Sequence, residues 1–184
     1  KTMSVFRHLE NKCCDSAKNP LYSKRNICFN AITNYEKRGC HMTDKDLSIQ
    51  TEEIQTDGKD TYYCHRYEPT PYEVLDELFT FYTPEKTDVF VDYGCGMGRL
   101  NFYIEKRYSL NSTGVEYSPV YYEKALENKK TYNGSKDKIH FVNCKAEDYL
   151  VSKNETVFYF FNPFSLELLK RVMGRILDSY YAKP

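Results

Sequence analysis

The chain has 184 residues, enough for one domain with a hydrophobic core and a smaller appendage. Its 26 basic and 26 acidic residues balance, which argues against recruitment of nucleic acid or an anionic membrane by overall charge. Seven cysteines without paired spacing, no signal segment and no membrane-spanning apolar run predict reduced thiols in a cytoplasmic protein.

Residues 1–66 are predicted to form a small, mainly helical N-terminal cap. Val5, Phe6 and Leu9 have helical spacing, and a second helical segment ends near Gly39. Asp57-Gly58 is a hairpin signal and predicts a ribbon after the two helices. The cysteines and histidines of this region lack the spacing of zinc ligands, so we expect no metal site.

From residue 67 onward, strand and helix patterns alternate along the chain. Strands are expected at 89–92, 112–116, 138–143 and 156–161, and helices beginning near 74, 99, 120 and 165. Such alternation is typical of βαβ units, which build an open parallel sheet with helices on both faces.

The most informative stretch is Asp88–Arg99, in which a short apolar strand runs into three alternating glycines and then a helix. Glycines let a ligand approach the backbone, and the helix N-terminus offers free N–H groups. The dinucleotide fingerprint G-x-G-x-x-G does not fit, because Arg99 stands at the third glycine. Asp92 would also repel a pyrophosphate but attract a cationic ligand that bears an amino acid group. The alternative interpretation is a purely structural turn.

The segment Asp92–Gly98 resembles motif I, D-x-G-x-G-x-G, of the class I S-adenosylmethionine-dependent methyltransferases. This resemblance implies a Rossmann-like fold over residues 67–184 and S-adenosyl-L-methionine as the cofactor. Such domains have seven strands, whereas four are predicted here, so we expect the C-terminal strands to be missing and the domain to be truncated. The strand at 156–161 would then have an uncovered edge, a candidate surface for self-association.

Glu116 ends the second predicted strand, 18 residues after Gly98, where a carboxylate would accept the ribose hydroxyls. An ordinary acid at a helix N-terminus is the alternative. After the third strand, Lys145-Ala146-Glu147 resembles the adenine-contacting segment of the protein arginine methyltransferases, although Lys145 replaces an aspartate common in the family. A solvated helix start would equally explain Glu147. The expected cofactor-binding residues are Thr70, Asp92, Gly94, Cys95, Gly96, Gly98, Glu116, Tyr117, Ala146 and Glu147.

The stretch ending in Asn162-Pro163-Phe164 resembles motif IV of amino-methylating members, (Asn/Asp)-Pro-Pro-(Tyr/Phe), with one proline fewer. The resemblance implies that Asn162 holds the attacking nitrogen and that Phe164 packs on it. A strand end followed by a helix cap is the alternative.

The segment Glu68–Tyr72 resembles the one that precedes motif I in lysine methyltransferases of the ATP synthase c-ring. The strand into motif I is similar to that of the non-SET histone lysine methyltransferases. These likenesses imply that Thr70 reaches the methionine carboxylate and that Tyr67 or Tyr72 lines the methyl-transfer channel. A linker stiffened by proline is the alternative.

The hypothesis is therefore a methyltransferase acting on an amine acceptor, first of all on a protein, with Asn162, Phe164 and Tyr72 as catalytic residues. A small-molecule acceptor is the second hypothesis. A catalytically idle nucleoside-binding or scaffold module is the third, because Lys145 and the single proline depart from the family patterns.

Overall fold

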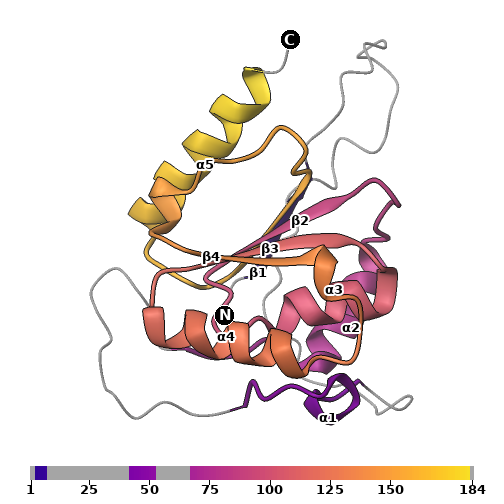
Figure 1. Cartoon of the computed structure of the whole chain (residues 1–184). Coiled ribbons are helices and arrows are strands. Elements are labelled where there is room, and N and C mark those ends of the chain that lie inside the picture. Colours follow the sequence, from indigo (N-terminus) through magenta and orange to yellow (C-terminus); the bar gives the residue numbers. More distant parts are fainter. Residues whose placement is uncertain (1–2, 8–41, 53–66, 183–184) are drawn as a thin grey trace.

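The computed structural model describes residues 3–7, 42–52 and 67–182 (Figure 1). The strands are β1 (Met3–Arg7), β2 (Val89–Tyr93), β3 (Asn111–Glu116), β4 (Ile139–Asn143) and β5 (Val157–Phe161). The α-helices are α1 (Asp44–Leu47), α2 (Tyr72–Phe81), α3 (Arg99–Tyr108), α4 (Pro119–Thr131) and α5 (Leu166–Tyr181). Two short 3-10 turns are η2 (Lys136–Lys138) and η3 (Ala146–Asp148). No helix among these residues is long and apolar enough to cross a bilayer.

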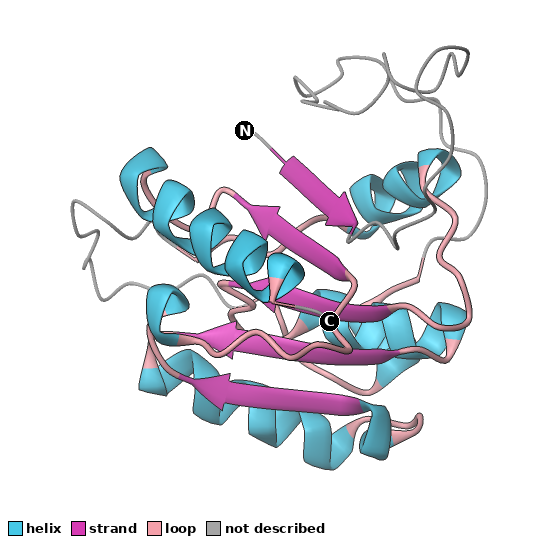
Figure 2. Ribbon diagram, turned by 90° about the horizontal axis from the view of Figure 1, so that it is seen from above, coloured by secondary structure: helices cyan, strands magenta, loops and turns pink. Residues whose placement is uncertain are grey.

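The strands form one sheet in the order β1-β5-β2-β3-β4. β5, β2, β3 and β4 run parallel, and helices cover both faces (Figure 2), which confirms the predicted open, Rossmann-like α/β fold. The chain moves outward from β2 through β3 to β4 and then returns to the other side of β2 as β5. The carboxyl end of β2 is therefore the switch point of the sheet, where ligands bind in such folds.

Alternating side chains of the strands feed two separate cores. Phe90 and Tyr159 face α2 and α3, whereas Val91 and Phe160 face α5. Helix α5 accordingly lies on the opposite face of the sheet from α2, α3 and α4 (Figure 1). Because neighbouring strand residues point to opposite faces, Asp92 shares the α3 face with its register partner Tyr159.

The N-terminal segment corrects two predictions. Residues Met3–Arg7 form strand β1 rather than the start of a helix, and β1 pairs antiparallel with β5 from Met3 opposite Phe161 to Arg7 opposite Val157. Pairing satisfies the backbone groups along the edge of β5, which outweighs a weak helical periodicity without a cap. The edge expected to be uncovered is therefore covered, and self-association through it loses its basis.

Helix α1 is the other described part of the predicted cap. A capping box between Thr43 and Asp46 caps its N-terminus. Its last residue, Leu47, is fully buried in the core on the α2 and α3 face of the sheet. The side chain of Asn128 on α4 makes two hydrogen bonds to the backbone of Gln50. Its Oδ1 accepts from the N–H at 2.8 Å, and its Nδ2 donates to the carbonyl at 2.9 Å. The segment 42–52 is thus fixed against α3 and α4. The second cap helix and the ribbon predicted around Asp57-Gly58 lie outside the described residues.

Candidate cofactor site

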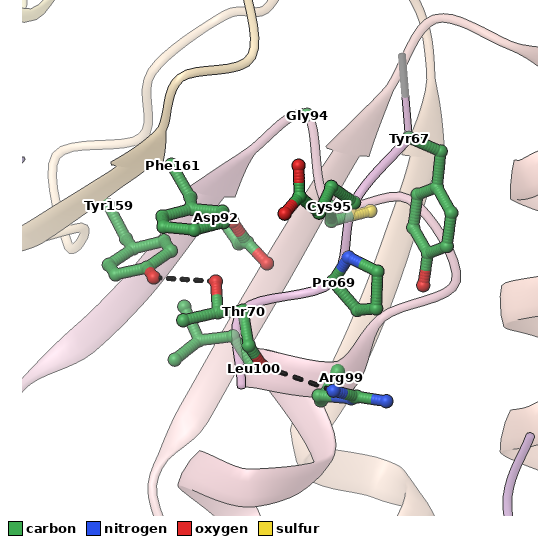
Figure 3. A pocket seen from close by; sticks show the side chains of 11 residues that line it. Tyr67, Pro69, Thr70, Asp92, Gly94, Cys95, Arg99, Leu100, Tyr159 and Phe161 are labelled. Carbon is green, nitrogen blue, oxygen red and sulfur yellow. Dashed lines mark hydrogen bonds between the residues drawn. The ribbon is translucent and has the colours of Figure 1, made fainter. Parts of the chain in front are cut away.

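A pocket opens at the carboxyl ends of β2 and β5, where the switch point places a ligand. Its walls come from the turn after β2, from the first turn of α3, from the end of β5 and from the segment Tyr67–Thr70 (Figure 3). Four of the predicted cofactor residues line it: Thr70, Asp92, Gly94 and Cys95. Sequence segments that are far apart therefore meet at one site.

The glycines of the turn serve different neighbours. Gly94 and Gly96 have left-handed φ angles of 75° and 55°. A Cβ on Gly94 would collide with Pro163, and a Cβ on Gly96 would collide with the ring of Tyr67. The absent side chain of Gly96 thus makes room for Tyr67, a role that the sequence analysis assigned to the ligand.

Gly98 is the N-cap of α3 at a φ of 88°, and a Cβ there would come within 2.6 Å of the Phe141 ring. The Phe141 ring of β4 therefore fills the space next to Gly98, which gives this glycine a packing role. Its predicted contact with the cofactor stays a prediction.

Two buried carboxylates flank the turn. Asp92 is 5% exposed, and burial, then repulsion from Glu116, raise its pKa to about 8. Burial also raises the pKa of Glu116, while hydrogen bonds from backbone N–H groups oppose that change. The two acids repel each other when both are ionised. A bound cation would lower this repulsion, whereas a pyrophosphate would add further negative charge.

The carboxylate of Glu116 is held in place by the backbone. The N–H of Gly96 donates to Oε2 at 2.8 Å, and the N–H of Ser118 donates to Oε1 at 2.8 Å. A carboxylate has about four acceptor positions, and these two donors together with the backbone N–H of Tyr117 leave part of that capacity free. This arrangement fits a ligand with two neighbouring hydroxyl groups.

Cys95 is buried, with 7% of its surface exposed. Burial, then repulsion from Glu116 and Asp92, raise the pKa of its thiol. Its Sγ donates weakly to the carbonyl of Gly96 at 3.7 Å. Cys95 is therefore a neutral group in the pocket lining. Its predicted contact with the cofactor stays a prediction.

Beyond Glu116 the surface is open. Tyr117 is 56% exposed at the end of β3, and Ala146 and Glu147 are half-buried on η3. All three follow the carboxyl ends of neighbouring parallel strands, β3 and β4, so they lie on the same edge of the sheet as the glycine turn. Whether they hold an adenine ring stays a prediction.

The three predicted catalytic residues do not lie together in one site. Asn162 is exposed directly after β5 and adopts a left-handed φ of 48°, a conformation that asparagine tolerates better than most residues. Phe164 is instead 9% exposed and packs against Phe160 and α5, so the core explains it. Tyr72 is also buried and outside the pocket lining, because its hydroxyl donates to Asp44 Oδ1 at 2.6 Å. Of the two alternatives for the channel, Tyr67 is the tyrosine that lines the pocket.

Arg99, for which no functional role was predicted, also lines the pocket and is 6% exposed. Its Nε donates to Thr51 Oγ1 at 2.6 Å, and one terminal nitrogen donates to the Thr70 carbonyl at 3.2 Å (Figure 3 draws the second bond). The guanidinium also lies 4.6 Å from the ring centre of Tyr72. A charged residue at the first position of a helix, in place of the fingerprint glycine, was the only signal for it in the sequence.

No protein-family model matches the chain, and no curated protein sequence matches it. Solved structures do resemble part of it. An RNA methyltransferase from Salinibacter ruber in complex with S-adenosyl-L-homocysteine is 28% identical over 46% of this chain and 55% of its own, with a TM-score of 0.42. A SAM-dependent methyltransferase from Thiobacillus denitrificans with the same ligand is 22% identical over 46% and 33%, with a TM-score of 0.39.

A geranyl diphosphate methyltransferase in complex with GPP and sinefungin is 23% identical over 42% of this chain and 29% of its own, with a TM-score of 0.38. In each case the similarity covers less than half of this chain. It covers 55%, 29% and 33% of the RNA, geranyl diphosphate and Thiobacillus denitrificans methyltransferases, respectively. The function of this chain is therefore inferred from the residues of its own site.

Proposed function

We propose that this protein is an S-adenosylmethionine-dependent methyltransferase that acts on an amine. The observation that carries the proposal is the pair of buried acids around a glycine turn at the switch point, with Asp92 and Glu116 on either side. A turn of this shape accepts a nucleoside. Its charge favours a ligand that is cationic and carries a ribose diol over one that carries phosphates.

The residues present fit this cofactor at both ends. Glu116 would accept the ribose hydroxyls with the oxygen capacity that Gly96 and Ser118 leave free. Asp92 would face the ammonium group of the methionine end. Thr70 would contact its carboxylate through a hydroxyl that already shares a 2.8 Å hydrogen bond with Tyr159. Residues 67–184 would form the cofactor-binding unit, while β1 and segment 42–52 from the first 66 residues support it.

S-adenosylmethionine, when bound, would supply a methyl group activated by a sulfonium: a nucleophile would attack the methyl carbon as the carbon–sulfur bond breaks, with S-adenosylhomocysteine as the leaving group. The protein then has to position the nucleophile, to exclude water and to let the amine proton leave. Asn162 is the proposed positioning group, because it follows β5 and its neighbour Pro163 occupies the space where a Cβ on Gly94 would lie. Carbonyl oxygens there would accept from the amine, and its proton would pass to solvent.

The first experiment is calorimetric titration with S-adenosylhomocysteine, followed by transfer of labelled methyl groups in a cell extract. We expect micromolar or tighter binding and label that stays on protein amines after alkaline treatment. Label confined to small molecules would overturn the protein acceptor. Binding without any transfer would favour the idle nucleoside-binding module.

A further inference from the structure

The pocket wall Tyr67–Thr70 is tied at both ends to residues that lie behind it. At one end, the hydroxyl of Tyr67 donates to the Thr51 carbonyl at 2.7 Å. At the other end, Arg99 donates to the Thr70 carbonyl at 3.2 Å. Both ties lead to Thr51, since Arg99 Nε donates to the hydroxyl of Thr51 at 2.6 Å.

Thr51 is fully buried and uses its N–H, its hydroxyl and its carbonyl. Its N–H and hydroxyl donate to the carboxylate of Asp44, the hydroxyl at 2.8 and 2.9 Å. The same carboxylate accepts from Tyr72 and lies 3.6 Å from Arg99 Nε. Asp44, which lies outside the pocket lining, thus balances the charge of Arg99. A second carboxylate oxygen, Glu52 Oε1, lies 3.5 Å from a terminal nitrogen of Arg99.

We propose that Thr51, Arg99 and Asp44 form a clamp that holds the pocket wall in its cofactor-binding position. Segment 42–52 then controls cofactor affinity although Thr51 does not line the pocket. A wall fixed before binding needs less ordering when the ligand arrives, so loosening it weakens affinity. This inference rests on the proposed cofactor, but it is independent of the methyl acceptor.

The test replaces Thr51 by two close relatives. Thr51→Val keeps the shape and removes the hydroxyl that joins Arg99 to Asp44, whereas Thr51→Ser keeps the hydroxyl. We expect Thr51→Val to weaken binding of S-adenosylhomocysteine about tenfold, and Thr51→Ser to restore affinity to within about twofold of the wild type.

Tyr103→Phe provides the matched control, because it removes a hydrogen bond from a buried side chain to a carboxylate, Asp76 Oδ1 at 2.7 Å, and neither residue lines the pocket. Tyr103→Phe should lower the melting temperature as Thr51→Val does and leave the Kd unchanged. A merely structural clamp would give both variants the same unchanged Kd, which would overturn the proposal.

If Thr51→Val does not fold, Tyr67→Phe decides, because it cuts the other tie of the wall. Unaltered affinity in that variant would also overturn the clamp. A wild-type protein that binds S-adenosylhomocysteine but transfers no methyl group counts against the proposed function alone. A wild-type protein that does not bind it overturns both.

Discussion

Asp92 offers a sharp test of the site, because its ionisation couples the charge of the ligand to pH. Burial and the neighbouring Glu116 raise the pKa of Asp92 to about 8, so at pH 7 the ligand-free protein holds this carboxyl mostly neutral. A ligand whose ammonium group pairs with the carboxylate must expel the proton. The affinity for S-adenosylhomocysteine should therefore rise about tenfold between pH 6 and 7 and less steeply as the pH approaches 8.

The same group imposes a pH dependence on folding. An unfolded aspartate ionises near pH 3.9, so between about pH 4 and 8 the folded protein binds one more proton than the unfolded chain. The free energy of unfolding consequently falls as the pH rises through this window. At about 1.4 kcal/mol per pKa unit, the cost by pH 8 is roughly 5 to 6 kcal/mol. Asp92→Asn should remove this cost and raise the melting temperature at pH 8.

The assay is calorimetry at pH 6.5 in two buffers of different ionisation enthalpy, which counts protons released on binding. We expect close to one proton for the wild type and none for Asp92→Asn, together with weaker binding. Asp88→Asn is the control, because Asp88 is a buried acid at the other end of β2, and it accepts from Tyr82 at 2.7 Å. An affinity that does not change with pH in the wild type would refute the pairing of Asp92 with a cation.

Three further changes test the rest of the site. Glu116→Ala removes the acceptor for a ribose, with charge-assisted hydrogen bonds worth about 1.5–3 kcal/mol each, so calorimetry should show at least a tenfold loss of cofactor affinity in a folded protein. Asn162→Gly keeps the left-handed backbone and deletes the side chain; we expect turnover to fall about a hundredfold at nearly unchanged cofactor affinity, and normal turnover would exclude the side chain from acceptor positioning. Gly96→Val should displace the Tyr67 ring, so that the melting temperature and the affinity fall together; a full loss of affinity at unchanged melting temperature would instead support direct contact between the ligand and this glycine.

Local patterns in the sequence were enough to predict the sheet and the turn. The four parallel strands and their helices fall within a few residues of the predicted bounds, because apolar periodicity and turn residues act over short stretches. The positions of Asp92 and Glu116 near the carboxyl ends of β2 and β3 were predictable for the same reason, while their contacts with a cofactor stay predictions. The same patterns failed at Met3–Arg7, because a short segment takes its structure from the strand it pairs with.

The sequence by itself thus determined the Rossmann-like sheet, the glycine turn and the two acids beside it. Only the tertiary structure decided which neighbours each of these residues has. Thr51 and Arg99 are 48 positions apart, and Thr70 and Tyr159 are 89 apart, yet each pair is joined by a hydrogen bond. The burial of Phe164 and the pairing of Tyr72 with Asp44 depend likewise on packing between distant elements. Such contacts follow from the way whole layers pack, so no local pattern of residues encodes them.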